Sequence, residues 1–181
     1  MAVLLAAAVV LRPLRESEIP ALARALVETS EAQIENRWRE QALGYRELLV
    51  AELDPSTGSG RSGELVGTVS ISESEGPWRQ PGGQAGSVHL FALEVAPALR
   101  DRGVGGAIVS GVLEEARRRG RRRVFLEVRV DNPARRLYYR LGFRRVGPAF
   151  VNAWWRFLAD GARERVEEVS YRMVKRVAPS P

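Results

Sequence analysis

The sequence contains no cysteine, one histidine and one lysine, and each scarcity excludes a class of site. Without cysteine there can be no disulfide, no thiolate metal ligand and no cysteine nucleophile, which fits the cytoplasmic location that we predict. The single histidine, His89, cannot build a multi-histidine metal centre, so we expect no metal. The single lysine, Lys175, does not stand in a glycine-rich loop, where a phosphate-binding lysine would be needed.

Positive charge is therefore carried almost entirely by arginine, and the formal net charge is +6. Guanidinium groups pair well with phosphate, so this charge suits a phosphorylated cofactor or a nucleic acid. The hydrophobic fraction of 45% and the charged fraction of 28% are those of a soluble globular protein. At 181 residues we expect a single domain over 1–181, with its patterned core at 9–177.

The apolar run 1–11 is the one candidate for a targeting segment. It lacks the basic start and the cleavage site of a signal peptide. It is also shorter than the roughly 20 residues that cross a bilayer. We therefore predict no membrane segment, and we expect the valines and leucines at 9–11 to begin the first strand.

Hydrophobic periodicity predicts strands and helices mixed along the chain, which is typical of an α/β or α+β domain. Two Gly/Pro-rich loops are expected at 54–63 and 76–86. A helix beginning after Gly103 carries an apolar stripe and ends at Gly120, and Ser17 is expected to cap the first helix. The predicted strands are 9–14, 48–53, 65–72, 87–96, 124–130, 143–146 and 169–177, and the predicted helices are 17–28, 31–42, 104–119 and 133–141.

The most informative segment runs from Val95 to Gly106. It reads as a strand that ends before a proline, a turn that carries Arg100 and Arg102, and three glycines that open a helix. Glycines let the backbone approach a ligand closely, and the N–H groups and dipole of a helix N-terminus favour negative charge. The glycine order differs from the Rossmann G-x-G-x-x-G, and a tight turn without a ligand is the alternative interpretation.

A second segment, Asn132 to Phe143, makes the pattern specific. Together the two segments resemble the GNAT superfamily of acyl-CoA-dependent N-acyltransferases. Arg100-x-x-Gly103-x-Gly105 matches the family's pyrophosphate motif, (Q/R)-x-x-G-x-(G/A), and Asn132…Ala134…Leu137-Tyr138-x-x-Leu141-Gly142-Phe143 matches its second signature. The family usually places the asparagine seven residues before the tyrosine, whereas here Asp131 stands there and Asn132 lies six before Tyr138.

The resemblance implies a GNAT-like domain whose mixed sheet of six to seven strands is flanked by about four helices. Two parallel strands, 87–96 and 124–130, would splay apart and hold acetyl-CoA between them. The pantetheine arm would pair with one strand, and the pyrophosphate would lie on the glycine turn. The cofactor-binding residues implied in this way are Leu93, Glu94, Val95, Arg100, Asp101, Arg102, Gly103, Val104, Gly105, Gly106 and Asn132.

The chemistry implied is direct attack of a primary amine on the thioester. Neutralising an alkylammonium at pH 7 costs on the order of 4–5 kcal/mol, so a base must assist. His89 and Glu127 are the alternative bases, one on each splayed strand, and Glu94 is a third candidate that packing alone could explain. Tyr138 matches the family's general acid, since a phenol remains protonated at neutral pH. A backbone N–H at 93–95 could stabilise the oxyanion.

The acceptor amine is left open between a small molecule and a peptide N-terminus. Trp38, Trp154 and Trp155 could line its pocket, fill the core or form a homodimer contact, with the last two expected in a loop before the last strand. A sensor that binds acyl-CoA without catalysis is the alternative function. The arginine cluster at 117–123 could bind nucleic acid. A solvated helix end explains it better, because no aromatic residues are interleaved with the arginines to stack on the bases of a single strand.

Overall fold

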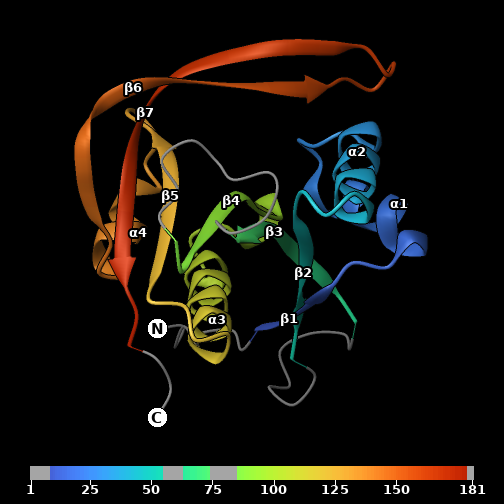
Figure 1. Ribbon diagram of the computed structural model, residues 1–181. Helices are drawn as coiled ribbons and strands as arrows, with labels where there is room; N and C mark the ends of the chain where they lie inside the picture. Colours follow the sequence, from blue (N-terminus) through green and yellow to red (C-terminus); the bar gives the residue numbers. More distant parts are fainter. Residues whose placement is uncertain (1–8, 55–62, 74–84, 179–181) are drawn as a thin grey trace.

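The computed structural model describes residues 9–54, 63–73 and 85–178. Most of the two predicted Gly/Pro-rich loops and the first part of the apolar run 1–11 therefore lie outside the described residues. A seven-stranded mixed sheet forms the centre, with strand order β1-β2-β3-β4-β5-β7-β6 (Figure 1). Its strands are β1 (Val9–Pro13), β2 (Glu47–Leu53), β3 (Leu65–Glu73), β4 (Ser87–Val95), β5 (Arg123–Arg129), β6 (Arg144–Phe157) and β7 (Arg163–Arg176).

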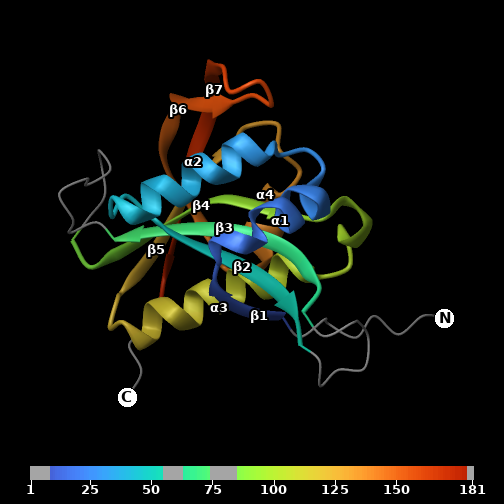
Figure 2. The ribbon, with the colours of Figure 1, turned by 90° about the vertical axis from the view of Figure 1, so that its right-hand side faces the viewer.

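Helices cover both faces of this sheet, as Figure 2 shows. The four α-helices are α1 (Ile19–Leu26), α2 (Glu31–Ala42), α3 (Val104–Arg118) and α4 (Arg135–Arg140). Strand β2 illustrates the division, because its side chains alternate between faces. Leu48 and Val50 pack in a smaller core with α1 and α2, whereas Leu49 and Ala51 join the main core with α3. The predicted mixed fold with four helices is confirmed.

The apolar stripe predicted for the helix after Gly103 is buried as expected. Its buried residues are Val104, Ile108, Val109, Val112, Leu113 and Ala116. The helix ends at Arg118, two residues before Gly120, which has a φ of 67°. The N–H of Gly120 donates a hydrogen bond to the carbonyl of Arg117 at 2.8 Å. The N–H of Arg121 donates to the carbonyl of Ala116, also at 2.8 Å. Glycine is favoured at this left-handed position because it has no Cβ.

The predicted start of the first helix is wrong. A 3₁₀ turn, Glu16–Glu18, precedes α1, so Ser17 lies inside that turn and does not cap the α-helix. The Glu18 carboxylate organises the turn, because it accepts from the backbone N–H of Arg15 at 3.0 Å and pairs with Arg12 at 2.7 Å. These tertiary contacts outweigh the local capping preference of a serine.

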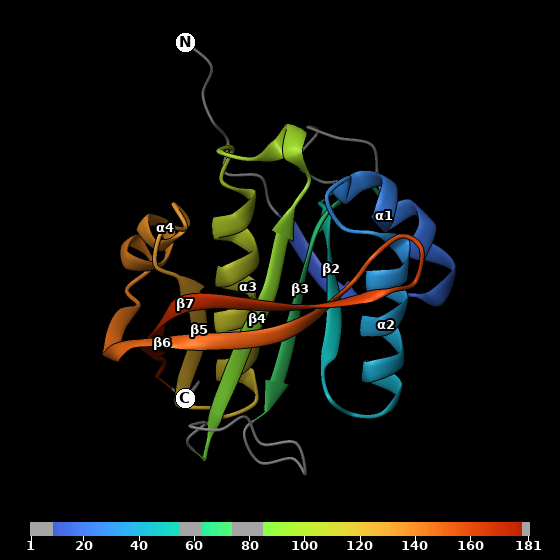
Figure 3. The ribbon, with the colours of Figure 1, turned by 90° about the horizontal axis from the view of Figure 1, so that it is seen from above.

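The late strands are much longer than the predicted 143–146 and 169–177. Strands β6 and β7 pair antiparallel as far as Phe157 and Arg163, with a register shift between Val146 and Phe150. Trp154 and Trp155, expected in a loop, therefore lie within β6. Figure 3 shows that this β6–β7 hairpin crosses over β4 towards α2. Periodicity missed the hairpin because much of it projects beyond the sheet and carries exposed side chains on β6.

Candidate active site

The two parallel strands at the centre of the sheet separate soon after they begin. Strand β4 pairs with β5 at only three positions, from Ser87 opposite Arg123 to His89 opposite Phe125. A register shift between β3 and β4 follows, and Ala92 there has a φ of 49°. Such a bulge bends the strand and leaves backbone groups unpaired with the neighbouring strand. A cavity of about 890 Å³ opens beside this separation and is bordered by α2 and the β6–β7 hairpin.

The two candidate bases are in contact with each other inside this cavity. The ring of His89 is 6% exposed and stacks against Phe91 and Phe125, each with its centroid 4.6 Å away. His89 Nε2 lies 2.5 Å from Glu127 Oε2. The other carboxylate oxygen, Oε1, accepts from the guanidinium of Arg172 at 2.9 Å. His89, Glu127 and Arg172 thus form one hydrogen-bonded unit rather than rival groups.

Burial alone would raise the pKa of the Glu127 carboxyl. The hydrogen bond from His89 and the charge of Arg172 outweigh this, so the pKa lies below its usual range. An ionised carboxylate only accepts hydrogen bonds, and this assigns the donor proton of the pair to His89 Nε2. His89 Nδ1 is buried and has no hydrogen-bond partner among the described residues. His89 and Glu127 both line the cavity, but Nε2 of His89 is engaged with Glu127 and Nδ1 is buried, so neither ring nitrogen is placed to take a proton from an amine.

Tyr138 reaches the same cavity from the short helix α4. Its side chain is 7% exposed and packs edge-on against Phe143, with ring centroids 5.9 Å apart. Burial raises its pKa to about 12, and no charge or hydrogen bond contributes to that shift. The phenol is consequently protonated throughout the neutral range and can donate a proton.

The glycine turn before α3 presents the features expected of an anion site. Gly103 is the N-cap residue with a φ of 86°, and no side chain caps the helix. The N–H groups of the first helical turn have no partner within the helix, so they remain available to a ligand. Arg102 is exposed, and Asp101 has a φ of 59°. Arg100 pairs with Glu28 at 2.5 Å and donates to the carbonyl of Val95 at 3.3 Å.

The other two glycines of the turn face protein rather than open space. A Cβ on Gly105 would lie 3.4 Å from Leu137 and 3.7 Å from Val95, and one on Gly106 would lie 3.6 Å from Leu137. These positions therefore bring the start of α3 close to α4. A Cβ on Gly103 would meet nothing within 4 Å, so its positive φ is the reason for glycine there.

The predicted pantetheine strand is held in place by Glu94. Its carboxylate pairs with Arg37 at 2.6 Å and accepts from the hydroxyl of Thr29. Leu93 and Val95 are partly buried against the main core. Packing and ion pairing thus account for Glu94 without a catalytic role. Arg37 and Arg172 were not found from the sequence, because nothing in an arginine-rich chain distinguishes a buried arginine from an exposed one.

Asn132 lies at the opposite border of the cavity, before α4. Its side-chain oxygen accepts from the N–H of Ala134 at 2.9 Å, so it also fixes the turn that leads to Tyr138. Of the three tryptophans, Trp154 and Trp155 line the cavity. Trp38 packs against the smaller core instead, which settles its position in favour of packing.

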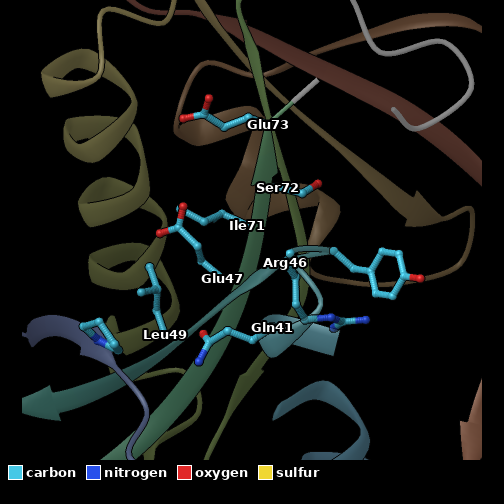
Figure 4. Close-up of a pocket in the computed structure, with 10 residues that line it drawn as sticks. Gln41, Arg46, Glu47, Leu49, Ile71, Ser72 and Glu73 are labelled. Atoms are coloured by element: carbon cyan, nitrogen blue, oxygen red, sulfur yellow. The ribbon is translucent and has the colours of Figure 1, made fainter. Parts of the chain in front are cut away.

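A second hollow of about 630 Å³ lies where β2 begins, at a distance in the chain from both motifs (Figure 4). Glu47 and Glu73 border it, and both pair with Arg119. Arg117, Arg118 and Arg121 of the same cluster also pair with glutamates. These ion pairs offset much of the cluster's charge, which weakens the case for nucleic-acid binding.

Within the parts of the chain that the structure describes, no helix is long and apolar enough to cross a membrane. The same residues contain no group of three or more histidine, cysteine, aspartate or glutamate side chains that could hold a metal ion.

The sequence profile described as the Acetyltransferase (GNAT) family matches residues 14–143. The chain belongs to this family. The resemblance inferred from the two motifs is thereby confirmed, and the protein is a GNAT acetyltransferase. Among curated proteins, this acetyltransferase is similar to N-acetyltransferase 8F1 of Rattus norvegicus, with 32% identity over 83 residues. That match covers 45% of this chain and 38% of the rat protein.

Solved structures share the fold of this GNAT acetyltransferase at low sequence identity. The ribosomal-protein-S18-alanine N-acetyltransferase of Escherichia coli has a TM-score of 0.62 at 18% identity, over 96% of both chains. A GCN5-related N-acetyltransferase of Kribbella flavida gives 0.64 at 22% identity, over 94% of this chain and 98% of that one. The yncA structure of Salmonella typhimurium, solved with its cofactor acetyl-CoA, gives 0.61 at 19% identity, over 96% of both chains.

Proposed function

We propose that this GNAT acetyltransferase transfers an acetyl group from acetyl-CoA to a primary amine within a ternary complex. The observation that carries the proposal is the cavity beside the separated β4 and β5, where Glu127 and Tyr138 both line the wall. Acetyl-CoA would supply a thioester carbonyl that an amine can attack. We assign the activity to a single acetyltransferase domain over 1–181 with its core at 9–177, in the cytoplasm.

The residues present fit such a cosubstrate. Uncapped N–H groups at the start of α3 and the exposed Arg102 can bind a pyrophosphate. Leu93 and Glu94 border the opening between the strands beside the bulge, and the segment from Leu93 to Val95 can pair with an extended amide chain. Asn132 lies on the opposite border. Arg100 would have to exchange its pairing with Glu28 for one with phosphate.

Glu127 is the group that would receive the proton of the incoming amine, directly or through one water molecule. His89 acts as a positioning residue, because its Nε2–H and the Arg172 guanidinium fix both carboxylate oxygens. Tyr138 would return a proton to the leaving thiolate. Because an alkylammonium has a pKa near 10.4, we expect the rate to rise with pH as the free amine becomes more abundant.

The test is a thiol-release assay with acetyl-CoA against amines, amino acids, peptides and aminoglycosides. We expect release with at least one primary amine, and a Tyr138→Phe variant should lower kcat roughly a hundredfold or more while the Kd for acetyl-CoA stays unchanged. Tight binding of acetyl-CoA without release across the panel would instead indicate a non-catalytic sensor. An unchanged kcat in Tyr138→Phe would remove the tyrosine from its role.

A further inference from the structure

The charged side chains around the cavity leave one carboxylate without a partner. Three arginine–glutamate ion pairs line the wall and cancel in charge, namely Arg37 with Glu94, Arg46 with Glu40, and Arg172 with Glu127. A further lining arginine, Arg129, pairs with Asp131 at 2.5 Å. Glu168 lines the cavity from β7 and has no ion pair or hydrogen bond within the described part of the chain. Four arginines and four glutamates line the wall, and among these glutamates Glu168 is the one that no arginine of the described residues pairs with.

The register of the β6–β7 hairpin places Glu168 on its inner face. Glu168 lies opposite Asn152, and both side chains are half-buried. The next pair, Val151 opposite Val169, is 63% and 48% exposed and leaves the strands on the opposite face, although Val151 also borders the cavity. Phe150 lies two residues before Asn152 and therefore on the same face of β6. The centroid of its ring is 5.6 Å from the guanidinium of Arg172. The inner face thus runs from the Glu127–Arg172 pair out to Glu168.

An unpaired carboxylate in a partly buried position favours a cationic ligand, because taking a charge out of water is costly without a partner. Trp154, two residues after Asn152 on the inner face of β6, also favours a cationic ligand. It lines the cavity, is 38% exposed and can offer its ring to a cation. Both features lie beyond the reacting centre, so they concern a second group of the acceptor.

We propose that the acceptor is a primary amine that carries a second cationic group, and that Glu168 binds this group. The proposal rests on the amine acetylation proposed above. Arg172 is the Cα partner of Glu127, and Glu168 lies four residues further along β7. At about 3.3 Å per residue, the two positions are about 13 Å apart, which sets the length of acceptor that can bridge them.

A linear diamine and a short peptide with a basic side chain both carry two such charges. The experiment therefore compares diaminobutane, diaminooctane and diaminodecane with alkylamines of the same length, and includes aminooctanoate. A tetrapeptide amide that ends in lysine is compared with its glutamine counterpart. The measured quantity is kcat/KM in the thiol-release assay at saturating acetyl-CoA. Whichever of the two series, the diamines or the peptides, gives the higher kcat/KM identifies the source of the second charge.

We expect the second cation to raise kcat/KM roughly tenfold once the chain is long enough, and Glu168→Gln to remove that advantage through KM. Glu167→Gln is the matched control, since Glu167 is exposed on the neighbouring position and pairs with Arg165. This control should keep the advantage. Unfolding temperatures close to wild type for both variants would show that each remains folded.

Equal kcat/KM for mono- and dicationic acceptors, or an advantage that survives Glu168→Gln, would overturn the inference while the acetylation itself stands. A preference for aminooctanoate would overturn it as well, because that compound places a negative charge near Glu168. No release with any amine would instead count against the proposed function, so the two failures are distinguishable.

Discussion

At the scale of single residues, the site depends on how three ionisable groups share two hydrogen bonds. The sequence left His89 and Glu127 as alternatives, but the structure connects them, with Arg172 holding the second carboxylate oxygen. A histidine whose Nε2 is engaged and whose Nδ1 is buried cannot readily take a proton from an incoming amine. This geometry favours Glu127 as the proton acceptor and His89 as its support.

Paired substitutions separate these two roles. In Glu127→Gln we expect kcat to fall roughly a hundredfold, because the proton acceptor is gone. In His89→Gln we expect most of the activity to remain, because an amide N–H can replace the Nε2–H donor. His89→Leu removes the donor, so the pKa of Glu127 rises and the acidic limb of the kcat/KM profile moves to higher pH.

Steady-state kinetics over a range of pH measure all three variants. If His89 were the base itself, His89→Gln would lose as much activity as Glu127→Gln. An acidic limb that stays in place in His89→Leu would also contradict the positioning role.

At the scale of elements, hydrogen bonds and ion pairs between segments far apart in the sequence fix the frame around the site. Ser30 at the start of α2 donates to the carbonyl of Phe157 at 2.8 Å, and Gln33 accepts from the Phe157 N–H at 2.6 Å. The far part of the hairpin is thereby fastened to α2 across the cavity. A comparable clamp joins β1, the 3₁₀ turn and β2, where Arg12 pairs with Glu18 and Glu52, each at 2.7 Å.

The Arg12 clamp makes a prediction for stability against pH. Hydrogen bonding from Arg12 lowers the pKa of Glu18 from 4.5 to about 2. A carboxyl whose pKa is lowered on folding stabilises the protein above its unfolded pKa, and the contribution is lost as pH falls towards the folded value. After discounting for solvent screening, we expect Glu18→Gln to cost about 1 kcal/mol at neutral pH and almost nothing near pH 2.

Urea unfolding of wild type and Glu18→Gln at several pH values measures this difference. Glu16→Gln is the matched control, because Glu16 is exposed in the same turn. A cost that does not shrink on acidification would show that the variant acts through packing rather than through charge.

At the scale of the whole molecule, the sheet consists of two parts with a weak connection. Strands β1 to β4 and strands β5 to β7 are joined in the sheet by only three residue pairs between β4 and β5, together with α3 packed across the join. The cavity lies where this connection stops. A ligand that bridges the two strands would therefore support the fold at its least connected place.

This arrangement predicts thermal stabilisation by coenzyme A. A ligand that binds only the folded state at about 100 times its Kd adds about 2.7 kcal/mol. We expect the unfolding temperature to rise with coenzyme A concentration, and hydrogen exchange to slow in β4 and β5. Dephospho-coenzyme A and adenosine serve as comparison ligands. Adenosine matching coenzyme A would contradict binding along the strands, since it lacks the pantetheine arm.

The sequence by itself determined the elements that carry strong local signals. The stripe of α3 and the glycine at position 120 depend on neighbours a few residues away, and so both could be predicted from the sequence. The glycine turn before α3 and the Tyr138 motif identified the family for the same reason. The start of α1 was misplaced because Glu18 is drawn to Arg12, a contact that no local pattern encodes.

Only the tertiary structure decided what surrounds the reacting centre. It joined His89, Glu127 and Arg172, which come from three strands, and it turned the region of Trp154 from an expected loop into the wall of a cavity. It also separated Glu168 from the paired carboxylates. Ion pairing and partial burial are properties of contacts between distant segments. The chain therefore encodes the acetyltransferase in its motifs, whereas the acceptor selectivity that we propose depends on how the hairpin lies across the sheet.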